Sequence, residues 1–284
     1  MLAALASSST LGSPTFMNAK IEARSVSKTY FSTRTGERVE ALHDVSFSLQ
    51  PHEFVSIVGP SGCGKSTLLS LVAGFAAPSA GEVLEDGARI SGPDPRRGVV
   101  FQDYALFPWR TVLGNVEFGP LARGASREAM RSTARRYIEL VGLAGFEQRY
   151  PHELSGGMRQ RCALARLLAN EPDVWLMDEP LAAVDLQTRN ILQDELLRLW
   201  GDGEERTQRR AVLFVTHGID EAVYLSDRVL VLGRRPGRIK EIVTIDLPRP
   251  RRSLRNSAAS GRHIDYIWGL IRDEAARAIV EESA

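Results

Sequence analysis

The sequence predicts an α/β fold whose central sheet consists mainly of parallel strands. Apolar runs of four or five residues, typical of buried strands, alternate along the chain with segments whose apolar residues repeat at helical spacing. One such run, Phe54–Val58, ends at a glycine-rich loop that leads directly into an apolar helical segment. The composition, with 43% hydrophobic and 25% charged residues, is that of a globular protein and excludes wholesale disorder.

The expected elements follow one another in the order that βαβ units require. Alternating residues predict a half-buried strand over Val45–Leu49, and Gly and Pro residues punctuate a β region over about 81–100. Continuous apolar runs predict buried strands over residues 54–58, 174–177, 211–215 and 229–232. Helical spacing predicts helices that begin near Ser66 and cover 126–141, 155–170 and 187–200, and a terminal amphipathic helix marked by Ile264, Ile267, Trp268, Ile271 and Ile279.

Size and charge exclude several functional classes. The 284 residues correspond to two average domains or one large α/β domain. The net charge of +1 argues against binding of nucleic acid by bulk electrostatics. The longest apolar run, Leu68–Ala77, has ten residues and is interrupted by a serine and a glycine, so the sequence predicts no membrane span.

The cysteines and the chain ends give little information about function. Cys63 and Cys162 have no metal-type spacing and no disulfide framework, which fits a reducing cytosol. Residues 1–18 are expected to be a disordered leader, with Met17 as an alternative start. Gly201–Arg210 is expected to be a charged loop and Pro248–Ser260 a linker, whose arginines at 249–255 favour a solvated segment over a lipid site.

Residues 59–67 match the phosphate-loop pattern G-x-x-x-x-G-K-[ST] between a strand and a helix. Glycines let the backbone curl so that its N–H groups converge on phosphate oxygens, and the helix N-terminus favours an anion. Lys65 would reach the β- and γ-phosphates, and the Ser66 hydroxyl would ligate Mg²⁺. The alternative, a glycine turn before a helix, does not account for the strand–loop–helix context.

A second motif is the apolar strand that ends in Asp178 and Glu179. Because the carboxyl ends of parallel strands face the ligand crevice, Asp178 would lie near the Mg²⁺ and Glu179 would polarise an attacking water. Taken alone, the pair could equally be a helix cap. Beside the phosphate loop, the catalytic interpretation is favoured.

Leu154-Ser155-Gly156-Gly157 stands at the start of a predicted helix. This arrangement is suited to an anion, although taken alone a capping serine with loop glycines is the simpler interpretation.

Together these motifs resemble the ATP-binding cassette (ABC) ATPases. The resemblance covers residues of about 20–245 and rests on the phosphate loop, Gln102, the Ser-Gly-Gly turn, Asp178-Glu179, Asp185 and His217. It implies a phosphate-loop NTPase cassette with a RecA-like core, an N-terminal antiparallel β region and an inserted α-helical subdomain at about 103–170. The ATPase domain would span 19–247, followed by a linker and terminal helix at 248–284.

The resemblance also implies a mechanism and a set of site residues. Two cassettes would sandwich two ATP molecules head to tail, so that Ser155 and Gly157 act on the ATP of the other copy. Glu179, His217, Lys65 and Gln102 would be catalytic, and Ser66, Gln102 and Asp178 would hold Mg²⁺. The nucleotide would be bound by Tyr30, Gly59, Pro60, Ser61, Gly62, Cys63, Gly64, Lys65, Ser66, Thr67, Ser155, Gly156, Gly157 and Asp185.

Several of these assignments have alternatives. Tyr30 would stack on adenine, with Phe31 as its competitor, or belong to the core. An isolated His217 would be structural, but its place after a buried strand favours contact with the γ-phosphate. Two departures, Ala182-Ala183-Val184-Asp185 after the catalytic Glu and Gly218 in place of the common Asp, put dimer contacts and rate in doubt, not the reaction class.

Three further stretches, 105–119, 221–222 and 235–251, resemble bacterial importer ATPases for nitrate, sulfonates, taurine and related anions. The implied partners are a second cassette, identical in a homodimer, transmembrane permease subunits and, indirectly, a periplasmic or lipid-anchored solute-binding protein, with no nucleic acid. The protein would lie at the cytoplasmic face of the inner membrane. Phe107-Pro108-Trp109 would dock the permease, the alternative being a loop around a buried Trp109. An exporter subunit is the second interpretation, and a non-transport cassette the third.

Overall fold

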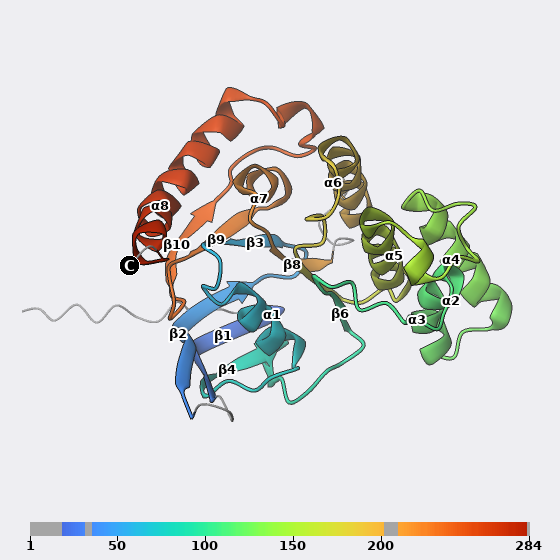
Figure 1. Ribbon diagram of the computed structural model, residues 1–284, viewed down its shortest axis with the longest axis horizontal. Helices are drawn as coiled ribbons and strands as arrows, with labels where there is room; N and C mark the ends of the chain where they lie inside the picture. Colours follow the sequence, from blue (N-terminus) through green and yellow to red (C-terminus); the bar gives the residue numbers. More distant parts are fainter. Residues whose placement is uncertain (1–18, 32–35, 202–209, 283–284) are drawn as a thin grey trace, which may run out of the picture.

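The computed structural model describes residues 19–31, 36–201 and 210–282, with side chains described as far as Arg272. The predicted leader, most of the predicted charged loop and the side chain of Ile279 lie outside this part of the chain. The described elements form two sheets with helices around them and a helical arm that projects to one side (Figure 1).

The central six-stranded sheet has the order β10-β9-β3-β8-β7-β6. The five strands from β9 to β6 pair in parallel, and only β10, at one edge of the sheet, pairs antiparallel. Its strands are β3 (Phe54–Val58), β6 (Arg97–Val100), β7 (Val174–Asp178), β8 (Ala211–Val215), β9 (Arg228–Leu232) and β10 (Ile239–Thr244).

A second, antiparallel sheet has the order β2-β1-β4-β5. The strand predicted at Val45–Leu49 begins earlier, because β2 covers Arg38–Leu49. Strand β1 was not predicted as an element, since bulges break its inside–outside alternation. The other strands are β1 (Ile21–Phe31), β4 (Ala80–Glu85) and β5 (Ala88–Arg89).

The helix α1 (Lys65–Ala73) lies between the two sheets, and its buried leucines belong to the same core cluster as strands of both (Figure 1). The opposite face of the central sheet is covered by α5 (Gly156–Ala169), α6 (Leu186–Trp200) and α7 (Ile219–Leu225). Three helices of the arm pack against α5, within the predicted range of 103–170: α2 (Val112–Val116), α3 (Phe118–Ala122) and α4 (Arg127–Leu140). The predicted α/β fold with an antiparallel N-terminal region and inserted helices is confirmed.

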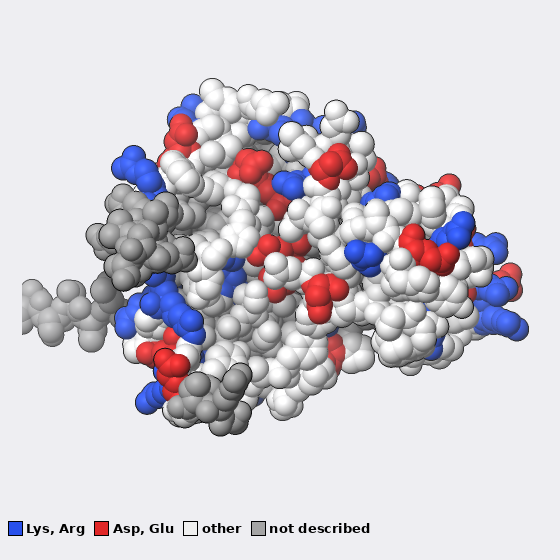
Figure 2. Space-filling view, in the orientation of Figure 1, with Lys and Arg blue, Asp and Glu red and all other residues white. Residues whose placement is uncertain are grey.

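The C-terminal helix α8 (Ala258–Glu282) packs on α7 through Ile267 and Ile271, as its amphipathic spacing predicts. None of the helices in the described part of the chain combines the length and apolar character that a membrane span needs. Figure 2 shows acidic and basic side chains interspersed over the visible face, in keeping with the balanced charge.

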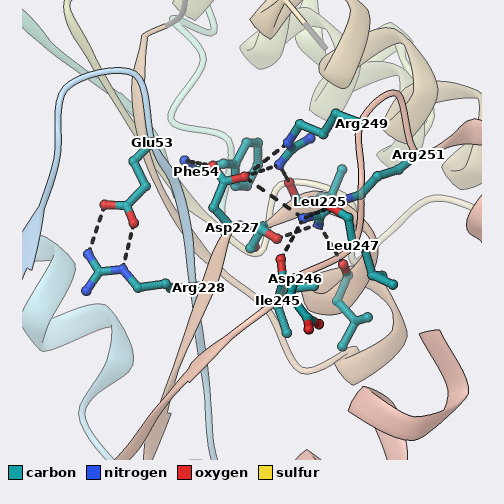
Figure 3. Close-up of polar contacts among 12 residues, drawn as sticks. Glu53, Phe54, Leu225, Asp227, Arg228, Ile245, Asp246, Leu247, Arg249 and Arg251 are labelled. Atoms are coloured by element: carbon teal, nitrogen blue, oxygen red, sulfur yellow. Dashed lines mark hydrogen bonds and ion pairs between the residues drawn. The ribbon is translucent and has the colours of Figure 1, made fainter. Parts of the chain in front are cut away.

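The expectation of a solvated arginine-rich segment at 249–255 is wrong for three of its four arginines. The Arg251 side chain is 1% exposed, and its guanidinium donates hydrogen bonds to backbone carbonyls of the last turn of α7 and of residues 245 and 247 (Figure 3). Arg249 donates to Asp227 at 3.0 Å, and Arg255 donates to Asp194 at 2.7 Å. Only Arg252, with 88% of its side chain exposed, behaves as a solvated cation. The last carbonyls of α7 have no partner within the helix, and by accepting hydrogen bonds from Arg251 they hold this segment against the domain.

Candidate active site

A polar pocket of about 430 Å³ lies at the carboxyl ends of the central strands. Because β3, β7 and β8 run parallel, the loops and residues that follow them meet at one edge of the sheet. The pocket is lined by Tyr30, Ala41, Ser61, Gly62, Gly64, Lys65, Ser66, Thr67, Gln102, Glu179, His217 and Arg235. Predicted site residues from five stretches of the sequence therefore surround one cavity.

The loop after β3 wraps around the Lys65 ammonium group. Lys65 is 5% exposed, and its Nζ atom donates to the backbone oxygens of Gly59 and Pro60, both at 2.9 Å. Gly64 has a φ of +101°, and a Cβ there would lie 2.8 Å from the backbone oxygen of Ala41, so only glycine fits. The helix α1 begins at Lys65, and the free N–H groups of its first turn make this end of the pocket suited to an anion.

Cys63 lies inside the same loop, with its Sγ atom 4.0 Å from Lys65 Nζ. Its side chain is buried, and burial raises the pKa of the thiol. A protonated, buried thiol is poorly reactive, so this position offers packing to the loop and no nucleophile.

Asp178 is the last residue of β7 and is 7% exposed. Burial raises the pKa of its carboxyl group and the adjacent Glu179 raises it further, while a hydrogen bond with the Ser66 side chain opposes the shift. Its Oδ1 atom is buried without a hydrogen-bond partner among the described residues. A carboxylate oxygen without a partner beside a hydroxyl is a donor set that Mg²⁺ prefers, so these two residues fit that ion.

Glu179 is held through its backbone and one carboxylate oxygen. Its backbone N–H donates to the oxygen of Val215 at 3.0 Å, and its backbone oxygen accepts from Nε2 of Gln160 at 3.0 Å. Its Oε1 atom lies 2.7 Å from Nε2 of His217. The residue has a φ of +49°, a left-handed conformation that costs energy for a residue with a Cβ. These contacts fix the carboxylate at the mouth of the pocket.

Two aromatic residues compete for the predicted adenine contact, and only Tyr30 lines the pocket. The Tyr30 ring is 42% exposed, with the Lys28 ammonium 5.0 Å from its centroid. Phe31 is 70% exposed and lies outside the lining. Gln102, just after β6, contributes to the same cavity.

The Ser-Gly-Gly turn and Asp185 do not line this pocket. Ser155 caps α5 by accepting from the N–H of Met158 at 3.3 Å, and Asp185 caps α6 by accepting from the N–H of Thr188 at 3.0 Å. Hydrogen bonds from Thr188 lower the pKa of the Asp185 carboxyl group. A Cβ at Gly156 would lie 3.9 Å from the Cβ of Ala183, so the turn lies beside the loop after Glu179.

Two site residues were missed by sequence reasoning. Arg235 lines the pocket, although the stretch that begins at Arg235 was singled out only for its resemblance to importer ATPases and not as part of the site. Gln160 is 2% exposed and reaches the Glu179 backbone from α5. A glutamine one turn into a helix carries no signal of such a contact, because its partner lies in another element.

Comparison with known proteins identifies a family and several relatives that are similar to this chain. Residues 42–182 match the family model described as ABC transporter. The uncharacterized ABC transporter ATP-binding protein MJ0412 of Methanocaldococcus jannaschii is 49% identical over 93% of this chain and 95% of its own length.

Two relatives carry functional names. The taurine import ATP-binding protein TauB of Roseobacter denitrificans is 48% identical over 74% of this chain and 76% of that protein. The nitrate import ATP-binding protein NrtD of Synechocystis sp. is 47% identical over 77% of this chain and 80% of that protein. Among solved structures, the dimeric post-hydrolysis state of the ATP-binding cassette MJ0796 with ADP and Pi matches with a TM-score of 0.70 and 34% identity, covering 79% of this chain and 98% of that chain.

Proposed function

This chain belongs to the ATP-binding proteins of the ABC transporters, and from that premise we propose that it powers import of a small anion such as nitrate, a sulfonate or taurine. Membership of the family makes it an ATPase that binds ATP and hydrolyses it to ADP and phosphate. The finer proposal is supported by relatives named for taurine, nitrate and aliphatic sulfonate import at 42–48% identity.

The assignment of catalytic roles rests on one observation, the convergence of Lys65, Ser66, Gln102, Glu179 and His217 on a single pocket. Lys65 and the N–H groups of residues 59–67, with Cys63 inside the loop, bind the β- and γ-phosphates, and Tyr30 stacks on adenine. Ser66, Asp178 and Gln102 hold Mg²⁺, which neutralises phosphate charge when bound. The described residues hold no cluster of three His, Cys, Asp or Glu side chains for a metal.

Glu179 acts on the attacking water. Its carboxylate takes a proton as the water oxygen attacks the γ-phosphorus and the bond to the bridging oxygen of ADP breaks. His217 holds that carboxylate at 2.7 Å and faces the position of the γ-phosphate. Glu179 then returns the proton to an oxygen of the departing phosphate.

The functional unit is a dimer of cassettes, with the copies arranged head to tail. Support comes from Ser155, Gly157 and Asp185, which lie outside the pocket of their own chain. They would complete the pocket of the second copy. The cassettes solved as dimers are similar to this chain. We assign residues 19–247 to the ATPase domain, about 103–170 to its helical arm and 248–284 to the C-terminal segment.

The permease contact is proposed at an aromatic groove of about 520 Å³ between the central domain and the arm. Phe75, Phe101, Phe107 and Phe118 contribute its apolar wall. Trp109 packs against Phe107 with a ring distance of 5.7 Å and remains 71% exposed, which excludes the alternative of a buried Trp109. An exposed aromatic beside an apolar groove suits a short helix of the membrane subunit. The chain would thus lie peripherally at the cytoplasmic face of the inner membrane.

Co-purification tests the importer assignment. Tagged protein from its native membrane should retain a permease that itself binds a periplasmic or lipid-anchored solute-binding protein. Trp109→Ala should lose the permease while the isolated protein keeps its ATPase activity. Trp268→Ala removes another exposed tryptophan, which lies on α8 and is 51% exposed; this matched control should retain the permease. Recovery of an export complex, or of no membrane subunit, would reject the importer assignment.

A further inference from the structure

A buried carboxylate, Glu221, lies behind the loop that carries His217. Glu221 is 8% exposed and lies in the first turn of α7. Its Oε2 atom accepts a hydrogen bond from the Thr216 hydroxyl, and its Oε1 atom accepts from Nε2 of Gln193 at 2.8 Å. The proposed hydrolysis steps make no use of this acid, yet it contacts the residue directly before His217.

Thr216 links Glu221 to both sides of the histidine. While its hydroxyl donates to Glu221, its Oγ1 atom accepts from the backbone N–H of Gly218 at 3.0 Å. The backbone N–H of Thr216 donates to Ile57 of β3 at 3.2 Å. The two neighbours of His217 are therefore tied together through one hydroxyl, whose direction Glu221 sets. This constrains the loop from which His217 reaches Glu179.

The same network continues to the C-terminal segment. The Arg255 guanidinium donates to the side-chain oxygen of Gln193, and it also donates to Asn190 at 3.0 Å and Asp194 at 2.7 Å. It lies 3.6 Å from the ring centroid of Tyr224 on α7. With its amide oxygen engaged by Arg255, Gln193 must direct its NH₂ group toward Glu221. Arg255 thereby selects the amide orientation that the buried carboxylate requires.

We propose that Glu221 is a positioning residue for His217 and that Arg255, acting through Gln193, makes the C-terminal segment part of the hydrolytic machinery. The inference rests on the proposed role of His217 in hydrolysis. It adds a route from residues 249–257 to the ATP site: Arg255 orients Gln193, Gln193 and Thr216 orient Glu221, and Thr216 fixes the loop. Two hydrogen-bond donors hold a buried carboxylate in one orientation. Loss of either donor leaves one carboxylate oxygen buried without a hydrogen bond.

The test compares kcat and KM for ATP in the full chain. Thr216→Val removes the hydroxyl with little change of shape, and Glu221→Gln leaves a single amide oxygen where Thr216 and Gln193 both need an acceptor. Each should lower kcat about tenfold and leave KM within about twofold, because the phosphate loop is untouched. Arg255→Ala should lower kcat about threefold, and Arg255→Lys should recover part of the loss.

Arg252→Ala is the matched control. Arg252 lies in the same segment and pairs with the same Asp194 carboxylate, at 3.7 Å, but its side chain is 88% exposed and is not hydrogen-bonded to Gln193, Glu221 or Thr216. Its removal should leave kcat unchanged. Titration with a fluorescent ATP analogue gives the fraction of binding-competent protein, so that a loss of folded molecules is separated from a loss of turnover.

The decisive measurement combines these variants with His217→Ala. If Glu221 acts through His217, the double variant His217→Ala/Glu221→Gln should have the kcat of His217→Ala alone. Multiplicative losses in the double variant, or an unchanged kcat in Thr216→Val and Glu221→Gln, would overturn the positioning role. A normal kcat in His217→Ala itself would instead reject the proposed function of His217, so the two failures are distinguishable.

Discussion

The Nε2 atom of His217 lies 2.7 Å from the Oε1 atom of Glu179, although the two residues follow different strands. β7 and β8 are parallel neighbours, and Asp178 pairs with Val215, so the residues just beyond them emerge side by side. The contact joins the proposed base and the proposed γ-phosphate ligand into one unit. A change at either residue should therefore alter the position of the other.

Glu179→Gln should abolish turnover while preserving nucleotide binding. The amide keeps the size of the side chain but cannot take a proton from water, and loss of a general base costs about 10²–10⁴-fold. We expect ATP to be bound without hydrolysis and an ATP-bound dimer to accumulate, visible by size-exclusion chromatography. Wild-type turnover in this variant would remove Glu179 from the proposed mechanism.

Removal of Mg²⁺ should stop hydrolysis, and Asp178→Asn should raise the Mg²⁺ concentration that gives half-maximal activity. Asp178 and Ser66 supply oxygen ligands, and an amide oxygen is a weaker ligand for a hard cation than a carboxylate. Chelation followed by titration with Mg²⁺ at fixed ATP measures the shift. Ser61→Ala, which changes a lining residue outside the donor set, should leave the Mg²⁺ dependence unaltered.

The elements around the pocket could be predicted because their signals are local. The loop after Val58, the acidic end of β7 and the histidine after β8 each stand next to an apolar strand, and parallel topology brings strand ends together. The contact of Gln160 with Glu179 could not be predicted, since a solvent-facing and a buried glutamine look alike in one sequence. The buried arginines of 249–255 misled for a related reason. The acceptors of Arg251 are backbone carbonyls, which residue types do not reveal, and Asp227 and Asp194, the acceptors of Arg249 and Arg255, lie in distant parts of the sequence.

Arg251→Ala should destabilise the protein by about 3 kcal/mol or more, because it leaves several buried carbonyls without donors and opens a cavity. Arg252→Ala, at the adjacent exposed position, should change stability by less than about 0.5 kcal/mol. Urea unfolding of the two variants checks the contrast. Equal stabilities would mean that the Arg251 contacts are replaced by water.

Glu221 predicts a pH-dependent stability. Burial raises the pKa of its carboxyl group in the folded state, with Asp220 adding to the shift and Thr216, Gln193 and Arg189 opposing it. As pH rises above the ordinary pKa of 4.5, the Glu221 carboxyl group ionises in the unfolded chain but stays protonated in the folded protein, where its pKa is higher. Its contribution to the stability of the folded protein therefore declines from pH 4.5 up to the folded-state pKa.

Glu221→Gln lacks this titration. As pH rises through this window, the free energy of unfolding of the variant should therefore increase relative to that of the wild type. Above the window, the difference between the two should stay constant. Urea unfolding at a series of pH values measures it. A difference that stays constant, or that shrinks with rising pH, would contradict the raised pKa.

At Glu179, the left-handed backbone conformation favours glycine for stability, whereas the proposed hydrolysis needs a carboxylate. An L-residue at a φ of +49° carries a strain of about 1–2 kcal/mol, whereas glycine enters this region freely at an entropic cost of roughly 0.5–1 kcal/mol. Conformational preference alone thus favours a residue with no side chain at the point where a carboxylate is needed. Selection of a mutant library for thermal stability alone would enrich glycine at position 179 and give a more stable protein without ATPase activity.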